Sequence, residues 1–279
     1  MKKRAHILPV LFIIAAVLLI MYVDSNYRLV TEEYEIKSEK FPKALSGLRV
    51  VHLTDMHNTE YGKDNSRFLN EVRAAEPDII CITGDIIDGT EANRDAEEAY
   101  VRRVISGLCE IAPVYYVSGN HEWASGWARQ LFDVIRECGG TVLRNQYVVI
   151  GEGDESFVLA GCDDPNGPRD MKTPAEVMDR IREREGDKYV LMLYHRHDRL
   201  DMWAETGVDA VLCGHAHGGM IRLPFTDGLY APGQVFFPKN TSGLYEKDGT
   251  VELVSRGVGG PKYRFLNNPE IVVAIFEHG

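Results

Sequence analysis

The sequence has few of the features that mark disordered, fibrous or disulfide-stapled proteins. Its 279 residues include only 5 cysteines, 12 prolines and 26 glycines, which excludes a collagen-like chain and a Pro- and Gly-rich disordered chain. The cysteines are odd in number and form no C-x-x-C pair, so we predict free thiols rather than a disulfide framework. Cys81 and Cys213 lie within apolar runs, where cysteine behaves as a small hydrophobic residue. With 44% apolar residues, the chain can bury a hydrophobic core.

Positive charge is also scarce. The chain has 31 Lys and Arg against 42 Asp and Glu, a formal net charge of −11. Lys2, Lys3 and Arg4 supply three positive charges at the start, so the rest of the chain carries −14. Such a chain does not attract phosphate backbones non-specifically. A dedicated nucleic-acid binder is therefore not expected.

One long apolar run departs from the pattern of a soluble protein. Residues 7–23 form an uncharged stretch of 17 residues after the basic N-terminus. A membrane-spanning helix needs about 17–25 residues and the apolar core of a signal peptide about 7–15, and no A-x-A-like cleavage site follows. We predict that residues 1–23 are a retained single-pass anchor in the cell membrane, with the rest of the chain on the extracytoplasmic side. A cleaved signal peptide is the alternative.

The remaining residues are predicted to form one domain of the α/β class. Residues 24–47 are a juxtamembrane segment with one strand, and residues 48–279 show no linker that would divide them. Their first half alternates apolar strands with helices at 65–75, 92–108 and 126–138, and their second half has mainly short apolar strands. Two packed sheets flanked by helices accommodate this mixture.

Five polar clusters directly follow apolar runs that are predicted to be buried strands. They are Asp55-Met56-His57, Gly84-Asp85-Ile86-Ile87-Asp88, Gly119-Asn120-His121-Glu122, His195 and Gly214-His215-Ala216-His217. Sites in α/β sheets are built at the carboxyl ends of strands, so these segments can converge. Their carboxylates, imidazoles and amide oxygen suit divalent Mn, Fe or Zn.

The number of candidate ligands predicts a pair of ions that share one carboxylate. The seven candidates are Asp55, His57, Asp85, Asn120, His195, His215 and His217. A single histidine or aspartate at a strand end is more often a loop residue or a helix cap. The metal hypothesis therefore depends on the seven residues together.

Other polar and aromatic residues have two interpretations each. Trp123 and Trp127 either stack on a sugar or acyl group or belong to the core, the commoner case. Arg256 either binds a substrate phosphate or is a surface strand arginine. The remaining histidines fit no motif, and His52 is predicted to be a strand residue near the site; they are His6, His52 and His278.

The ordered motifs D-x-H, G-D-x-x-D, G-N-H-E, H and G-H-x-H, between Asp55 and His217, resemble those of the calcineurin-like metallophosphoesterase superfamily. The apolar N-terminus and the segment from Ser255 to Glu270 resemble its bacterial anchored or exported branch, which is similar to UDP-2,3-diacylglucosamine pyrophosphatases. The resemblance implies a two-sheet β-sandwich flanked by helices and two divalent metal ions.

The resemblance also implies roles for the motif residues. One ion would be held by Asp55, His57, Asp85 and His217, and the other by Asp85, Asn120, His195 and His215. His121 would bind phosphate and act as the general acid, and Asp88 would pair with it and raise its pKa. Near relatives continue the His195 motif as H-x-P-D, whereas this chain has His197 in place of the proline, so His197 is expected to contact substrate rather than metal.

These observations predict a membrane-anchored binuclear phosphohydrolase. It would cleave a phosphodiester or pyrophosphate bond with a metal-activated hydroxide, on an envelope or lipid-linked phosphoester substrate. A phosphomonoesterase or phosphoprotein phosphatase uses the same metals and is one alternative. A non-catalytic metal-binding scaffold at the membrane is another, although metal binding alone needs neither His121 nor Asp88.

Overall fold

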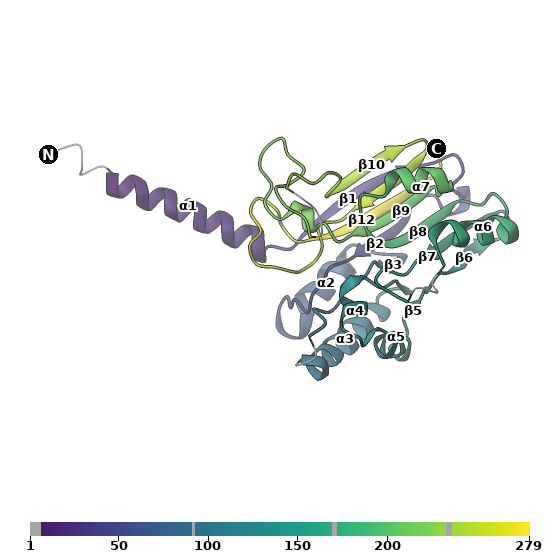
Figure 1. Cartoon of the computed structure of the whole chain (residues 1–279), viewed down its shortest axis with the longest axis horizontal. Coiled ribbons are helices and arrows are strands. Elements are labelled where there is room, and N and C mark those ends of the chain that lie inside the picture. Colours follow the sequence, from purple (N-terminus) through teal and green to yellow (C-terminus); the bar gives the residue numbers. More distant parts are fainter. Residues whose placement is uncertain (1–6, 91–92, 169–171, 233–235) are drawn as a thin grey trace.

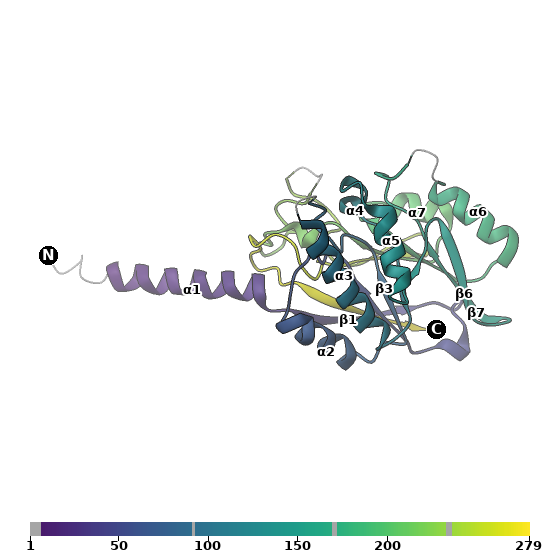
Figure 2. The ribbon, with the colours of Figure 1, turned by 90° about the horizontal axis from the view of Figure 1, so that it is seen from below.

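A long N-terminal helix projects from the body of the protein, residues 28–279 (Figures 1 and 2). The computed structural model describes residues 7–90, 93–168, 172–232 and 236–279. Helix α1 (Ile7–Tyr27) contains a stretch, Leu8–Tyr27, with a mean hydropathy of 2.4. Within the described ranges it is the one helix long and apolar enough to cross a membrane. The predicted apolar helix is confirmed, and its side chains are largely exposed.

Two six-stranded mixed sheets form the body. The first has the order β1-β12-β2-β3-β4-β5 and the second β10-β11-β9-β8-β7-β6. The strands of the first sheet are β1 (Val30–Lys37), β2 (Leu48–Leu53), β3 (Ile79–Ile82), β4 (Val114–Tyr116), β5 (Thr141–Val142) and β12 (Glu270–Glu277). The strands of the second are β6 (Gln146–Glu152), β7 (Glu155–Gly161), β8 (Val190–Arg196), β9 (Ala210–Gly214), β10 (Gly243–Lys247) and β11 (Thr250–Val254).

Helices cover the outer face of each sheet, which gives four layers. On the first sheet lie α2 (Ser66–Ala74), α3 (Arg94–Cys109), α4 (Asn120–Ala124) and α5 (Ala128–Glu137), and on the second α6 (Pro174–Glu185) and α7 (Leu200–Thr206). Short 3-10 turns are η2 (Lys43–Leu45), η3 (Lys63–Asn65) and η5 (His217–Gly219). The predicted α/β fold with two sheets flanked by helices is confirmed.

The alternation of side chains along each strand explains why both faces of the sheets are buried. Val50 of β2 packs between the two sheets with Leu191 of β8. The next residue, Val51, faces the opposite way and packs with Val104 of α3. On the other side of the molecule, Trp203 of α7 packs beneath the second sheet. Two-sided burial is the reason that these strands are continuous apolar runs in the sequence.

Most of the predicted elements are present, and the exceptions are short. Strand β1 was expected in the juxtamembrane segment, and it pairs in parallel with β12. Strands β5 and β10 and helix α4 were not predicted, because two to five residues give little periodicity. All five cysteines are free, as predicted.

The topology brings the ends of five strands together. β2, β3 and β4 are parallel neighbours in the first sheet, and β8 and β9 are parallel neighbours in the second. The two sheets face each other across a shared core, so the carboxyl ends of these strands lie at one edge of the sandwich. The register between β8 and β9 shifts between Leu193 and Arg196, which places an irregularity at His195.

Candidate metal centre

Left-handed backbone turns follow the strands at the candidate site. Asp55, His57, Asp85, His215 and His217 have φ between 46° and 68°. This region is uncommon for residues other than glycine, and the surrounding structure must over-determine it. At each turn the chain changes direction after the strand, and the side chain at the turn points toward the ends of the neighbouring strands. Five of the seven candidate ligands therefore lie in this uncommon backbone conformation.

Two glycines allow these turns to pack tightly against one another. A Cβ on Gly214 would lie 2.1 Å from Thr54 Oγ1 and 2.4 Å from Asp55 Oδ2. A Cβ on Gly119 would lie 2.2 Å from Asp85 Oδ1. Neither position has room for a side chain, so the glycines of the G-N-H-E and G-H-x-H motifs are required by the close approach of the strand ends.

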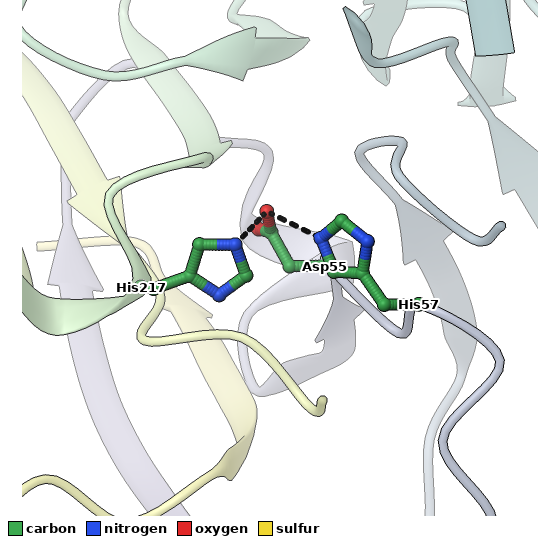
Figure 3. Close-up of side chains that lie close together, drawn as sticks. All are labelled: Asp55, His57 and His217. Carbon is green, nitrogen blue, oxygen red and sulfur yellow. Dashed lines mark ion pairs between the residues drawn. The ribbon is translucent and has the colours of Figure 1, made fainter. Parts of the chain in front are cut away.

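The first cluster of candidate ligands is centred on Asp55. Figure 3 shows its carboxylate between the rings of His57 and His217. Oδ1 of Asp55 lies 3.3 Å from Nε2 of His217 and 3.8 Å from Nε2 of His57. Oδ2 accepts hydrogen bonds from the backbone N–H of His215 and the hydroxyl of Thr54, both at 2.8 Å. The hydrogen bonds to Oδ2 thus fix the orientation of the Asp55 carboxylate, and Oδ1 faces the imidazoles of His57 and His217.

The second cluster is centred on Asp85 and His195. Nε2 of His195 lies 3.2 Å from Oδ2 of Asp85, and 3.1 Å from both Oδ1 of Asn120 and Nδ1 of His215. Oδ2 of Asp85 also lies 3.8 Å from Nε2 of His57. Asp85 therefore stands between the two clusters, which is the position expected of a bridging carboxylate. All seven predicted ligands are brought together.

Buried polar atoms that lack hydrogen-bond partners indicate whether divalent cations fit at this site. Within the described residues, Oδ1 of Asp55 and Nε2 of His57 are buried and have no hydrogen-bond partner. Burying such atoms unpaired costs free energy, and a cation between them would offset that cost. Nδ1 of His57 lies 3.0 Å from Oδ1 of Asp88, and Nδ1 of His195 lies 2.7 Å from the carbonyl of Thr83. Such contacts orient the rings of metal-binding histidines. The donor set fits two ions.

The carboxylates control the protonation of the histidines. Burial disfavours a charged ring at His57 and His195, but the neighbouring carboxylates outweigh burial and raise the pKa of each to about 10. Burial, reinforced by these two cations, lowers the pKa of His215 and of His217 to about 3. Without metal, two protonated imidazoles therefore neutralise the buried carboxylates.

Metal binding is accordingly expected to release protons. His57 and His195 hold protons below pH 10 in the metal-free protein, and an imidazole must be neutral to bind metal. At pH 7 we expect about two protons released per chain, with apparent affinity rising as the pH increases toward 10. Titration calorimetry with Mn²⁺ in two buffers of different ionisation enthalpy measures this release. An identical heat in both buffers would contradict it.

The same pKa shifts set the stability of the metal-free protein. The folded-state pKa of His57 and His195 lies above the ordinary value of 6.5. Their contribution to the free energy of unfolding is therefore fully present below about pH 6.5 and is lost as the pH rises through about 10.

The prediction that the carboxylate of Asp88 pairs with His121 is wrong. Asp88 uses its carboxylate to hold His57. His121 is held instead by the backbone carbonyl of Asp88, which lies 2.8 Å from its Nδ1. With Nδ1 of His121 bonded to this carbonyl, Nε2 on the other side of the ring faces Asp85. Nε2 lies 4.0 Å from Oδ2 of Asp85. The His121 side chain is 39% exposed, so it stands at the entrance of the cluster.

Glu122 is an organising residue to which the sequence analysis gave no role. It is fully buried and accepts hydrogen bonds from three backbone N–H groups, those of Asp85 at 3.0 Å, Ile86 at 2.8 Å and Gly119 at 2.6 Å. It thereby ties the loop after β3 to the loop after β4. The place of Glu122 in the G-N-H-E motif could have predicted this role, since a glutamate three residues after a helix start commonly bonds back to the backbone.

Glu122→Gln is expected to destabilise the fold. The amide nitrogen cannot accept, so at least one buried N–H would lose its partner, at a cost of roughly 2–3 kcal/mol. For a domain of this size, Tm should fall by about 5–10 °C, measured by thermal unfolding in EDTA. The matched control is Glu137→Gln, because Glu137 makes a single exposed ion pair with Arg102 and should change little. Equal Tm values for the two variants would contradict the organising role.

Two arginines lie behind the cluster. Arg256 is largely buried instead of being a surface residue, and its guanidinium is paired with buried Glu270 and with Glu32. Arg264, which no motif singled out, is fully buried. Its Nη2 donates to the carbonyls of Gly259 and Arg256 and lies 3.2 Å from Nδ1 of His217.

The remaining residues flank the site or lie away from it. Trp127 and Trp123 pack in the core beside α5, which agrees with the core interpretation. His52 is a buried strand residue 2.8 Å from Thr83 Oγ1. His197 is buried with its ring 6.1 Å from that of His215, so it has no exposed face for the expected substrate contact. His278 contacts the carbonyl of Phe41, and His6 lies outside the described residues.

Comparisons with known proteins agree with this geometry. Residues 48–219 match the family of calcineurin-like phosphoesterases. An uncharacterized metallophosphoesterase of Aquifex aeolicus is 33% identical over 89% of this chain and 92% of its own length. YkuE of Bacillus subtilis, also an uncharacterized metallophosphoesterase, is 30% identical over 87% and 84%. The phosphodiesterase YaeI of Escherichia coli is 29% identical over 71% and 70%. The chain therefore belongs to the calcineurin-like phosphoesterase family and is a metallophosphoesterase.

Proposed function

We propose that this protein is anchored in the cell membrane by α1 and hydrolyses a phosphodiester or pyrophosphate bond with two divalent ions. The observation that carries the proposal is the convergence of five strand ends on Asp85, with unpartnered Asp55 Oδ1 and His57 Nε2 beside it. Asp55, His57, Asp85 and His217 would hold one ion, and Asp85, Asn120, His195 and His215 the other. The ions, Mn, Fe or Zn, would neutralise phosphate charge and activate water near neutral pH.

The residues at the entrance of the site account for the rest of the chemistry. His121 is partly exposed, and its Nδ1 is fixed by the carbonyl of Asp88, so its Nε2 can donate a proton to the leaving oxygen. Asp88 acts through His57 and is a positioning residue. Glu122 holds the backbone of the loop that carries Asp85.

The substrate class is inferred from one relative, from α1 and from the sequence resemblance. The relative in Escherichia coli is named a phosphodiesterase, which favours a diester over a monoester or a phosphoprotein. The apolar helix α1 favours an envelope or lipid-linked substrate and an extracytoplasmic domain. Cleavage of a pyrophosphate, as in the UDP-2,3-diacylglucosamine pyrophosphatases that the sequence resembles, is a further part of the proposal.

The test measures metal content and hydrolysis on one preparation. The full chain is purified in detergent without chelators, and kcat/KM is measured with Mn²⁺ on bis-p-nitrophenyl phosphate and on p-nitrophenyl phosphate. About two ions per chain with faster diester turnover would support the proposal. Faster monoester turnover would favour the phosphatase alternative. Bound metal with no turnover of either ester or of a pyrophosphate-linked nucleotide would favour the scaffold alternative.

A further inference from the structure

We infer that two loops beside the end of α1 contact the membrane surface and hold the metal centre there, so that the substrate is the headgroup phosphoester of a membrane lipid. This rests on the proposed phosphodiesterase function and names its substrate class. The first loop connects η5 to β10 and is described at residues 220–232 and 236–242. The second connects β11 to β12, residues 255–269. We call them the interfacial loops.

The distribution of exposed apolar side chains sets these loops apart. Outside α1, the described residues include nine large hydrophobic side chains that are exposed. Seven of the nine lie on the interfacial loops: Leu223, Phe225, Tyr230, Phe236, Phe237, Tyr263 and Leu266. Phe225 is fully exposed. Such a concentration, rich in aromatic residues, marks an interaction surface, and aromatic residues are enriched where proteins meet the membrane interface.

Hydrogen bonds join the two loops to each other. The backbone N–H of Arg222 donates to the carbonyl of Phe265 at 2.9 Å, and the N–H of Phe265 donates to Met220 at 3.2 Å. Within the first loop, the N–H of Phe237 donates to Leu229, and Leu229 in turn donates to Ile221. The apolar side chains therefore lie on two loops that are bonded to each other.

The second loop is also bonded to the end of α1. The amide of Asn26 donates to the carbonyl of Arg264 at 2.8 Å and accepts from its N–H at 2.9 Å. The N–H of Leu266 donates to Ser25 Oγ at 2.8 Å, and Tyr22 donates to the carbonyl of Lys262 at 2.9 Å. Ser25 and Asn26 are buried by these contacts. The loops are thus fixed at the level of the last turns of α1.

The length of α1 places that level at the boundary of the hydrocarbon. The uncharged run at residues 7–23 has 17 residues, which at 1.5 Å per residue spans about 26 Å, close to the bilayer core of about 30 Å. Tyr22 and Tyr27 then lie where interfacial tyrosines are enriched. Figures 1 and 2 both show the second loop beside this end of α1, on the side of the body from which the helix projects.

A groove at the same junction has an apolar side and a polar side. It has a volume of about 570 Å³ and is lined by Leu19, Ile20, Val23, Asp24 and Tyr27 of α1 together with Arg28 and Arg67 of the body. Arg28 is ion-paired with Asp24 at 2.5 Å, so Arg67 is the arginine that would face a headgroup phosphate, while an acyl chain would lie along the apolar side of the helix. This observation is independent of the loops and favours lipid as the occupant of the surface.

The second interfacial loop reaches the metal centre directly. Arg264, held by Asn26 through its backbone, places its guanidinium 3.2 Å from Nδ1 of His217. Gly260 passes so close to His217 that a Cβ there would lie 2.6 Å from the ring. One segment therefore contacts the end of the anchor and packs against the candidate site.

Photo-crosslinking in the full chain tests the surface without needing activity. The residue p-benzoylphenylalanine replaces Phe225 or Phe237, and in matched controls Val149 or Leu244, the two exposed hydrophobic residues away from the loops. The protein is reconstituted into vesicles of phosphatidylethanolamine and phosphatidylglycerol. Lipid adducts should form at positions 225 and 237 in at least about tenfold higher yield than at the controls. Equal yields, or adducts with protein instead of lipid in native membranes, would overturn the inference.

A kinetic test separates the surface from the chemistry. The double variant Phe225→Ser, Phe237→Ser should lose about tenfold or more in kcat/KM on a phospholipid phosphodiester in vesicles and keep full activity on bis-p-nitrophenyl phosphate. The control Val149→Ser, Leu244→Ser should change neither. Unchanged activity on the vesicle substrate would overturn the lipid-presenting role. If the unmodified protein hydrolyses no phosphoester, the proposed function fails, while the crosslinking result still decides the membrane surface.

Discussion

Asp85→Asn should abolish metal binding at the shared position and reduce kcat/KM by about a thousandfold or more. The side chain keeps its size but loses the charge that faces three imidazoles, with Oδ2 at 3.2 Å from His195, 3.8 Å from His57 and 4.0 Å from His121. Among the described residues, Asp85 is the carboxylate that belongs to candidate metal-binding groups with both His57 and His195. The measurement combines metal per chain by mass spectrometry with hydrolysis of bis-p-nitrophenyl phosphate.

The control for this replacement is Asp133→Asn on α5. Asp133 is exposed and forms one ion pair with Arg136, so metal content and turnover should not change. A folded Asp85→Asn protein that retained two ions and full turnover would show that the metals are held elsewhere. Near-native circular dichroism distinguishes loss of the site from loss of the fold.

His121→Gln should lower kcat by roughly 10²- to 10⁴-fold while leaving the metal content intact. His121 is the partly exposed imidazole of the cluster, fixed through Nδ1 by the carbonyl of Asp88. If its Nε2 protonates the leaving oxygen, the loss must grow as the leaving group becomes more basic. The measurement compares diesters whose leaving groups are p-nitrophenol, phenol and methanol.

A constant loss across these leaving groups would contradict the general-acid role and point to phosphate binding alone. The matched control is His278→Gln, because His278 is bonded to the carbonyl of Phe41 near the C-terminus. It should leave both kcat and the leaving-group dependence unchanged.

The sequence carried enough information to predict that the candidate ligands converge, because they follow strands that periodicity identifies. Parallel neighbouring strands end at the same edge of a sheet, so Asp55, Asp85 and Asn120 had to meet once β2, β3 and β4 were recognised. His195 and His215 followed from the same rule in the second sheet. The motif glycines beside these residues were also predictable, since positions that lack room for a Cβ accept no other residue.

The spacing of residues in the sequence did not predict which side chains pair with the candidate ligands. Asp88 lies three residues after Asp85 in a loop, and whether its carboxylate meets His57 or His121 depends on the left-handed turns at His57 and Asp85. Aspartate and histidine adopt such φ angles more readily than most residues, but only packing decides which positions of the loop do so. The prediction for Asp88 failed at this point.

The sequence by itself determined the fold class, the apolar N-terminal helix and the set of candidate ligands, because each depends on local periodicity or on ordered motifs. Only the tertiary structure decided that Glu122 joins two loops, that Arg264 lies behind His217, and that Ser25 and Asn26 bind the loop that reaches the metals. These contacts connect residues up to 241 positions apart. The contacts of Glu122, Ser25 and Asn26 are with backbone groups, which every sequence offers equally, so only the folded path of the chain selects among them.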